Sequence, residues 1–344
     1  MVTAAITGFG RAVPAVADQR SLWDQVFAER FAGAPRAAAI WRAVGVRSRG
    51  RVADPRTEDL SGWGTEARMR RFVEEATPLG KEAVTGALDD AGIDPSRIDQ
   101  LTVVSCTGYS TPGLDVLLAR DLGMRPDTER LHIGHMGCFA ALPAIAVAAD
   151  AARARDRTSV VLCVELSSLH VQPATHDPEQ VLVHALFGDA AAACVVSPTA
   201  AGLEVVDTVT RTEPEAAPLM TWDVTDRGFR MSLAADVPDV LAGLIRPTVE
   251  GLLARSGLGL ADVAGWAVHP GGPRILEIAE RELALDEAAL DVSRTILREC
   301  GNTSSASLLL ILQRLVAGSL PAGPVVAVAF GPGLTLAASL LRRR

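Results

Sequence analysis

Two stretches of this chain repeat one pattern at one spacing, and this repeat constrains the fold more than any other feature. Residues 91–104, AGIDPSRIDQLTVV, align with residues 256–269, SGLGLADVAGWAVH, 165 positions later. The strand-like run 160–164 aligns with residues 325–329 at the same offset. Such a repeat predicts two similar halves related by a pseudo-twofold axis. The alternative is a pair of ordinary βα units in an unduplicated α/β protein.

The repeated stretches alternate helical and strand-like segments, which predicts an α/β fold. Residues 101–105 and 159–164 are strand-like, and the second run has the low polarity of a strand that is buried on both faces. Residues 81–91 are typical of a helix. The 344-residue chain is 49% hydrophobic but only 4% aromatic, so small aliphatic side chains must fill a large core.

Cys138 follows a glycine and precedes an alanine-rich segment that continues to about Arg155. If this segment is a helix, Cys138 lies at its N-terminus, where free N–H groups and the helix dipole favour a thiolate. A thiolate of low pKa is a nucleophile at neutral pH. Asn302 follows a glycine 164 residues later, so we expect Cys138 and Asn302 to face one central cavity. The alternative is a structural cysteine, because free cysteine is often buried.

His269 has the best defined context of the six histidines. It ends a strand-like run and precedes the turn sequence PGGP, a position where α/β folds place site residues. His132 and His135 are closer to Cys138 in the chain, but both can equally be loop residues. Asn302 can act as a helix cap, which explains it fully, or its amide can donate to an oxyanion beside His269.

Charge and cysteine usage exclude several classes of protein. The net charge of −8 argues against a nucleic-acid binder, although arginines are dense between residues 42 and 56. The five cysteines show no CxxC spacing, which predicts neither a disulfide framework nor a metal site. The N-terminus lacks the features of a signal peptide, and the uncharged run 325–341 is too short for a confident membrane span. We therefore expect a cytoplasmic protein.

Four motifs together resemble the type III polyketide synthases, the chalcone synthase-like family. They occur in the family's order and spacing over nearly the whole chain: GCFA at 137–140, HPGGP at 269–273, GNTSSAS at 301–307 and FGPGLT at 330–335. The resemblance implies a thiolase fold, in which duplicated βαβαβαββ halves form five αβαβα layers. Residues 1–200 would form the half with the cysteine, and residues 201–344 the half with the histidine and asparagine.

The family's activity and site residues can be transferred to matching positions in this chain. The resemblance implies a catalytic triad of Cys138, His269 and Asn302. It also implies that an acyl group from acyl-CoA is loaded on the cysteine, extended with malonyl-CoA by decarboxylative condensation, and cyclised. Substrates would be coenzyme A thioesters, with no permanently bound cofactor, and the protein would be a homodimer. Phe187 matches a gatekeeper phenylalanine of the substrate tunnel, and Ser304 is a further candidate for contact with substrate.

Other positions depart from the family pattern. The second gatekeeper phenylalanine aligns with Met231, although a shifted register would place Phe229 there. Ser167 and His170 occupy positions where plant members mostly carry small hydroxyl residues. His170 would narrow the cavity and bind a polyketide carbonyl, unless it bonds a neighbouring backbone group instead. With Met231, it favours a small or slender aliphatic starter over a bulky aromatic one.

The basic residues that hold coenzyme A phosphates in the family do not match one for one, so Arg42 and Arg47 are only candidates. Two other functions remain possible on the same fold. One is a ketoacyl synthase III-like enzyme that uses acyl-carrier protein, although its histidine motif is usually HQAN. The other is a catalytically silent partner subunit, against which the intact triad argues.

Overall fold

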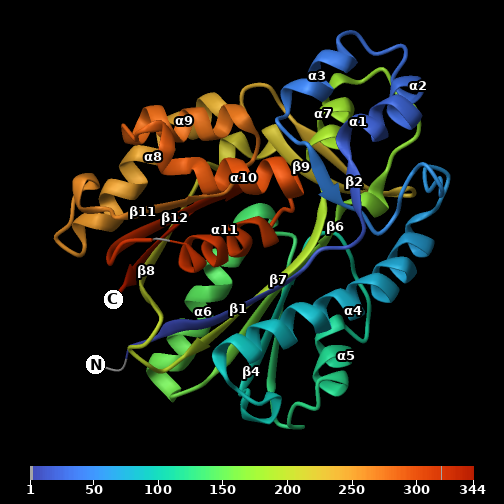
Figure 1. Cartoon of the computed structure of the whole chain (residues 1–344). Coiled ribbons are helices and arrows are strands. Elements are labelled where there is room, and N and C mark those ends of the chain that lie inside the picture. Colours follow the sequence, from blue (N-terminus) through green and yellow to red (C-terminus); the bar gives the residue numbers. More distant parts are fainter. Residues whose placement is uncertain (1–2, 319) are drawn as a thin grey trace.

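The computed structural model describes residues 3–318 and 320–344, and its main sheet contains nine strands in the order β11-β12-β13-β8-β1-β7-β6-β4-β5 (Figure 1). Strands β1 and β8 connect its two parts through two residue pairs, Ala5 with Glu204 and Ile6 with Leu203. The first part consists of β1 (Ala5–Ala12), β4 (Gln100–Ser105), β5 (Glu129–Gly134), β6 (Ser159–Leu166) and β7 (Asp189–Ser197). The second consists of β8 (Leu203–Thr212), β11 (Gly265–Val268), β12 (Gly323–Gly331) and β13 (Thr335–Arg343).

Helices cover both outer faces of this sheet system and fill the space between its two parts. They include α4 (Thr65–Ala91), α5 (Leu114–Asp121), α6 (Ala141–Arg155), α8 (Val237–Ala254), α9 (Pro273–Leu283), α10 (Asp291–Cys300) and α11 (Ala306–Ala317). Further elements lie near the top of Figure 1: α1 (Gln19–Leu22), a π-helical turn (Trp23–Phe27), α2 (Ala28–Arg30), α3 (Ala37–Ala43), α7 (Pro178–Leu186), and the strand pairs β2 (Val16–Asp18) with β3 (Ser48–Gly50) and β9 (Met220–Thr225) with β10 (Gly228–Leu233).

Alternate residues of the central strands contact different helical layers. In β6, Val160 and Leu162 pack in one core with α4 and α5, whereas Val161 packs in another with α6 and α11. In β12, Ala327 faces the α6 and α11 core, whereas Val328 packs in a third core with α8 and α9. The layers are therefore helix, sheet, helix, sheet and helix. This confirms the expected αβαβα thiolase architecture with α6 and α11 at its centre.

Backbone conformation repeats along with the element order. Gly92 and Gly257, 165 residues apart, have φ angles of 65° and 69°. Gly137 and Gly301, 164 apart, have φ angles of 76° and 70°. These left-handed conformations favour glycine, so both copies keep it where the chain must turn. The repeat fails at one position. The N-terminal half has strand β5 there, whereas among the described residues of the C-terminal half the helix α10 occupies the corresponding place in the sequence.

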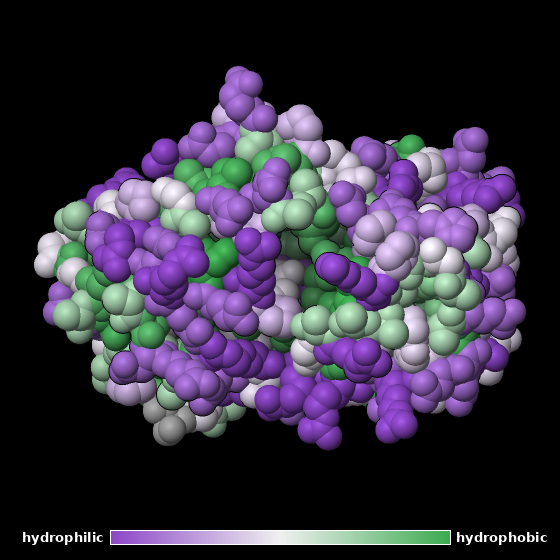
Figure 2. All heavy atoms as spheres, turned by 90° about the horizontal axis from the view of Figure 1, so that it is seen from above, coloured by the Kyte–Doolittle hydropathy of each residue, from purple (hydrophilic) through white to green (hydrophobic). Residues whose placement is uncertain are grey.

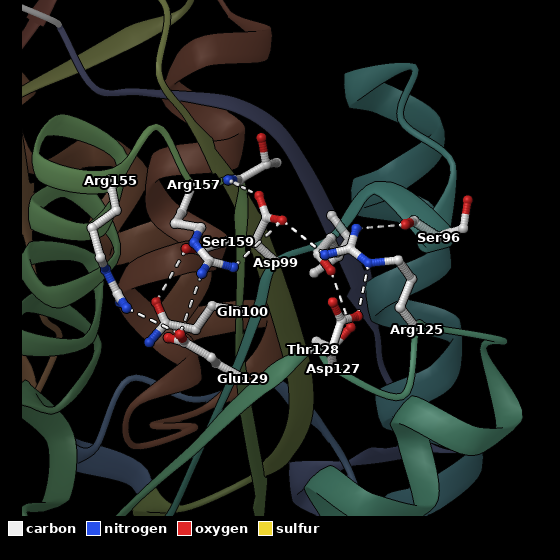
Figure 3. A network of polar contacts seen from close by, with 12 residues as sticks. Ser96, Asp99, Gln100, Arg125, Asp127, Thr128, Glu129, Arg155, Arg157 and Ser159 are labelled. Carbon is white, nitrogen blue, oxygen red and sulfur yellow. Dashed lines mark hydrogen bonds and ion pairs between the residues drawn. The ribbon is translucent and has the colours of Figure 1, made fainter.

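A polar network marks the end of the sheet that lies away from the candidate site (Figure 3). Asp99 accepts a hydrogen bond from the Thr158 N–H at 2.9 Å and pairs with Arg125 at 2.9 Å. Glu129 pairs with Arg155 at 3.0 Å. Because these groups are partly exposed, each pair adds little stability. These groups lie where β4, β5 and β6 begin. The opposite end of the sheet therefore carries the carboxyl ends of these parallel strands, which is where α/β folds build sites.

One helical segment, Gly137–Arg155, is long and apolar enough to cross a membrane by length and composition alone. Its most apolar window is 67% buried inside the protein, because α6 is a central core helix. The uncharged run 325–341 forms the antiparallel strands β12 and β13. All five cysteines are buried with free thiols.

The contact of β1 with α4 generates a stability prediction. A Cβ atom at Gly10 would lie 2.0 Å from the Ala83 carbonyl oxygen and 2.3 Å from the Ala87 nitrogen. Gly10→Ala should therefore push α4 away from the sheet and lower the free energy of unfolding by about 2 kcal/mol. Gly251→Ala is the matched control, since nothing lies within 4 Å of that position in α8. The control should stabilise the helix by about 0.5–1 kcal/mol. Equal stability of both variants in denaturant unfolding would contradict the prediction.

Candidate active site

A cavity of about 730 Å³ has Cys138, His269 and Asn302 in its wall, so three residues from distant parts of the chain meet there. Most of the remaining lining is apolar and comes from α3, α7, α8 and α9. Figure 2 looks onto the upper face of the molecule, where hydrophobic side chains line a hollow surrounded by hydrophilic ones. The three polar groups therefore react in a largely apolar environment.

Cys138 lies in a short 3-10 turn, Gly137–Phe139, that leads into α6. The turn needs the positive φ of Gly137, and a Cβ there would also lie 2.5 Å from a Pro332 ring carbon. Cys138 is only 6% exposed, but it lines both the 730 Å³ cavity and a second cavity behind it. The thiol is thus reachable from the cavities although the residue is buried.

His269 follows β11 and is held by its own N–H, which donates to the Val328 carbonyl at 2.8 Å. Its side chain is buried against the edge of Phe330, at 6.0 Å between ring centroids. Neither ring nitrogen has a hydrogen-bond partner in residues 3–318 and 320–344. An imidazole in a cavity wall with both nitrogens unpaired is available to bind substrate and to move a proton.

Asn302 is fixed from both sides. Its Oδ1 accepts from the Ser304 N–H at 2.8 Å, its own N–H donates to the Leu186 carbonyl at 2.9 Å, and its carbonyl accepts from the Gly188 N–H at 3.0 Å. Because Oδ1 is occupied by the turn, the orientation of the carboxamide is set and its N–H₂ group is the end left for a ligand. The Asn302 oxygen thus holds the turn before α11, although Ser305 is the N-cap of that helix, and donation by the amide nitrogen to an oxyanion stays a prediction.

The expected low pKa of Cys138 is wrong for the ligand-free protein. Burial raises the pKa of Cys138 to about 12, although hydrogen bonds from Ser304 and Asn302 act in the opposite direction. Burial also lowers the pKa of His269 to about 3. Both shifts favour a neutral thiol beside a neutral imidazole, because the cost of removing charge from water exceeds the effect of the turn. These shifts oppose proton transfer from Cys138 to His269 in the resting site, although an unpaired ring nitrogen of the neutral His269 is free to accept a proton.

The second cavity, which we call the inner chamber, has a volume of about 270 Å³. Cys138, Phe187, Met220 and Met231 line both this chamber and the outer cavity, so the thiol and the gate residues lie where the two meet. The chamber also carries hydroxyl and thiol groups, from Cys106, Thr107, Ser167, Thr221 and Ser304. An acyl group on Cys138 can therefore extend from the entrance into a separate, partly polar space.

The hairpin of β9 and β10 separates the two candidates for the second gate. Met231 pairs with Trp222 across the hairpin and lines the inner chamber, whereas Phe229 stacks on His170 with 4.6 Å between ring centroids. Met231 thus lines the same two cavities as Cys138, and Phe229 lines neither. Trp222 was missed by the sequence reasoning, because no motif marks it and the hairpin places it only by strand pairing.

The proposed contact of His170 with substrate is not supported. Its Nδ1 accepts from the Phe229 N–H at 2.9 Å, so its Nε2–H donates to the Thr107 carbonyl at 2.7 Å. Burial lowers the pKa of His170 to about 4, so the ring stays neutral in these contacts. The alternative interpretation is the correct one: His170 bonds backbone groups and joins the β9–β10 hairpin to the end of β4.

The chain matches both domain models of one protein family. Residues 55–200 match the family model described as chalcone and stilbene synthases, N-terminal domain. Residues 204–343 match the model for the C-terminal domain of the same family. The chain belongs to the chalcone and stilbene synthase family. These two matches cover most of its length and include every member of the triad.

Two similar bacterial proteins carry functional names. The 1,3,6,8-tetrahydroxynaphthalene synthase of Streptomyces peucetius subsp. caesius is 34% identical over 310 residues, 87% of this chain and 81% of the relative. The alpha-pyrone synthesis polyketide synthase-like Pks18 of Mycobacterium tuberculosis is 33% identical over 280 residues, 78% of this chain and 71% of the relative. Both names describe polyketide-forming enzymes or products.

Solved structures agree with the assignment. The tetrahydroxynaphthalene synthase of Streptomyces coelicolor A3(2), a bacterial type III polyketide synthase, superposes with a TM-score of 0.93 at 30% identity and covers 99% of both chains. PKS-I from the brown alga Ectocarpus siliculosus gives 0.92 at 28% identity, covering 100% of this chain and 99% of that one. The protein is a type III polyketide synthase with the thiolase fold.

A buried carboxylate supports the site of this polyketide synthase. Glu165, at the end of β6, accepts hydrogen bonds from the Thr107 hydroxyl at 2.8 Å, from the Cys106 N–H at 3.1 Å and from the Ser305 hydroxyl. Ser305 is three residues beyond Asn302. Glu165 therefore fixes the ends of β4 and β6 to the turn that carries Asn302, a role that nothing in the sequence indicated.

The arginines suggested for coenzyme A lie outside the wall of the outer cavity. Arg42 is exposed in the last turn of α3, whose Ile40 and Ala43 line that wall. Arg47 is also exposed and its N–H donates to the Arg298 carbonyl. The arginine that lines the cavity is Arg274, which directly follows the HPGGP motif.

The neutral resting pair generates a pH prediction. In substrate-free protein, alkylation of Cys138 by iodoacetamide should accelerate from about pH 6 to about pH 9, because only the thiolate reacts and burial keeps the thiol protonated. His269 should add no titration of its own in this range, since its pKa is lowered. Mass spectrometry of the modified peptide measures the rate. Cys194, buried in β7, is the internal control and should remain unmodified. A rate that is flat over this range would show a resting ion pair instead.

Proposed function

We propose that this type III polyketide synthase loads an acyl group from acyl-CoA onto Cys138 and extends it with malonyl-CoA, followed by cyclisation. The observation that carries this proposal is the arrangement of Cys138, the unpaired imidazole of His269 and the oriented amide of Asn302 in one cavity wall. In this role the enzyme is a decarboxylating acyltransferase. The substrates are coenzyme A thioesters, and the protein's own side chains supply the chemistry.

Loading begins when His269 takes the thiol proton of Cys138 and the sulfur attacks the thioester carbonyl. The bond between the acyl carbon and the coenzyme A sulfur then breaks, and coenzyme A leaves with the proton held by His269. The nucleophile needs this base because burial disfavours a free thiolate. The proton passes from Cys138 to His269, and negative charge develops on the sulfur, only while the substrate fills the apolar cavity.

Extension requires an enolate. Malonyl-CoA loses CO₂ and its electron pair remains on the thioester as an enolate, whose oxygen needs hydrogen-bond donors. An N–H of His269 and the amide of Asn302 are suited to this, and each such donor contributes about 10²–10³ in rate in comparable oxyanion sites. The enolate carbon then attacks the acyl group on Cys138, and the Cys138 sulfur is released as the lengthened chain passes to coenzyme A.

The inner chamber suits a short polyketide chain. It holds about 270 Å³, and Met231, a flexible side chain, replaces a rigid aromatic gate at its entrance opposite Phe187. Ser167 and Ser304 offer hydroxyls to the carbonyls of the chain. A small or slender aliphatic starter fits this space better than a bulky aromatic one. The names of the relatives suggest a cyclised product of the naphthalene or pyrone class.

Several further features belong to the same proposal. Residues 1–200 and 201–344 are the two thiolase-like halves. Arg274, in the wall of the outer cavity, supplies positive charge for the coenzyme A phosphates. Arg42, on the helix that contributes Ile40 and Ala43 to that wall, and Arg47 add to this charge. The enzyme is a homodimer, as the family resemblance implies, and is cytoplasmic, as its cysteine usage suggests.

Variants of the triad test the proposal. Cys138→Ala should abolish the acyl-enzyme seen by intact-mass spectrometry after addition of acyl-CoA. Asn302→Ala should still form it but lose malonyl-CoA decarboxylation by about 10²–10³-fold, because one enolate donor is missing. Release of CO₂ measures the second step. Cys300→Ala, a buried cysteine at the end of α10, should leave both steps intact. An Asn302→Ala enzyme that decarboxylates but cannot load would refute the assigned roles, and failure of the native enzyme to acylate would favour a silent subunit.

A further inference from the structure

A third, smaller cavity of about 30 Å³ adjoins the inner chamber, and we call it the polar pocket. Ser167, Phe187, Trp222 and Met231 line both spaces, so the polar pocket continues from the chamber. The side chains it does not share with the inner chamber are Arg51, Ser168, His170, Val171, Gln172, Gln180, Val183, His184 and Phe229. The polar pocket therefore differs from the mostly apolar outer cavity by a wall in which one guanidinium lies among several other polar side chains.

Arg51 is a buried cation that forms no direct ion pair within the described residues 3–318 and 320–344. The residue is 5% exposed, its Nε donates to the Ala53 carbonyl at 3.0 Å, and its Nη2 has no partner in the part of the chain that the structure describes. A buried charge is costly unless it is paired or hydrogen-bonded. The Ser167 hydroxyl, on the boundary with the inner chamber, likewise has no partner there. The polar pocket thus offers two unused donors.

Two carboxylates act on Arg51, but neither is its direct partner. The oxygens of the buried Asp189 accept from the Val52 N–H, the Ser168 N–H and the Ser168 hydroxyl, and Asp54 pairs with Arg56. Arg49 adds a second buried guanidinium, which donates to the Phe187 carbonyl at 2.8 Å.

His184 contributes no charge. Its Nε2 accepts from the Gln172 N–H at 3.0 Å, so its Nδ1–H donates to the Gln180 carbonyl at 2.7 Å. Burial, assisted by the nearby arginines Arg51, Arg30 and Arg49, lowers the pKa of His184 to about 3. The other histidine in the wall, His170, is neutral as described above. The region therefore has a net positive charge.

From this arrangement we infer that the polar pocket binds the distal carboxylate of the acyl group on Cys138, so that the starter is the mono-coenzyme A thioester of a short dicarboxylic acid. The inference rests on the proposed function. Arg51 and Ser167 donate to the carboxylate, and the slender chain spans the inner chamber between Phe187 and Met231. Loading itself is unchanged, since the acyl carbon exchanges the coenzyme A sulfur for the Cys138 sulfur and the remote carboxylate takes no part.

Water offers a simpler explanation, because a cavity of this volume can hold one or two molecules. Water would satisfy Arg51 Nη2, the Ser167 hydroxyl and the unpartnered Gln180 Oε1 equally well. It would, however, give no preference for a charged starter. The two explanations therefore differ in what Cys138 accepts.

The experiment compares acids with neutral chains of similar length. Succinyl-CoA is paired with pentanoyl-CoA, and glutaryl-CoA with hexanoyl-CoA, without malonyl-CoA, so that only loading occurs. The rate of acyl-enzyme formation at Cys138 is followed by intact-mass spectrometry. We expect at least one acid to load about tenfold faster than its neutral partner, in line with the strength of a hydrogen bond between charged groups.

Variants assign the preference to Arg51. Arg51→Met keeps the volume but removes the charge, so it should abolish the preference while leaving neutral loading within about twofold. Arg56→Met is the matched control, because Arg56 pairs with Asp54 outside the polar pocket and should keep the preference. Ser167→Ala should reduce the preference more weakly. Circular dichroism confirms that each variant is folded.

The outcomes separate this inference from the function on which it rests. If none of the four thioesters acylates Cys138, the proposed function itself fails. If the neutral chains load as fast as the acids in the native enzyme, the carboxylate site is refuted and the polar pocket holds water only. This second result is measured on the native enzyme alone, so it refutes the inference whether or not Arg51→Met folds. A preference that survives in folded Arg51→Met would also overturn it.

Discussion

The packing of α6 and α11 in one core between the two parts of the sheet is the constraint on which the active site depends. Each helix is preceded by a turn that requires a glycine of positive φ, Gly137 in one half and Gly301 in the other. These turns deliver Cys138 and Asn302 to the same cavity wall. Because the helices are held by core packing on both sides, neither residue can move without disturbing both sheets.

Burial decides the electrostatics of this site more than dipoles or local hydrogen bonds do. It holds Cys138 and His269 in their neutral forms, although a helix N-terminus alone would favour the thiolate. The same low polarity strengthens any interaction that a substrate makes with an unpaired donor. The site is therefore neutral at Cys138 and positive around Arg51, and the hairpin of β9 and β10 forms part of the wall of the inner chamber.

The outer cavity and the inner chamber have different proposed roles. The outer cavity is mostly apolar, with residues of α3 and α9 in its wall, and in the proposed function it admits the thioester while the inner chamber receives the growing chain. Phe187 belongs to both and is itself fixed by Arg49 at its carbonyl and by its backbone bridge to Asn302. If Phe187 is the gate and Asn302 the enolate donor, as proposed, this backbone contact links the segment that selects substrate to the segment that takes part in catalysis.

The sequence by itself determined the features that local pattern and spacing encode. These are the duplication, the alternation of helices and strands, the five layers implied by the family motifs, and the identity of Cys138, His269 and Asn302. The tertiary structure alone decided the rest. His170 is bonded to Thr107, 63 residues away, and to Phe229, 59 residues away, and the hairpin places Met231 rather than Phe229 in the walls of the cavities that Cys138 lines. Protonation states and the burial of Arg51 depend on how much water the surrounding layers exclude. Such properties arise from contacts between distant segments, so no local pattern in the chain could predict them.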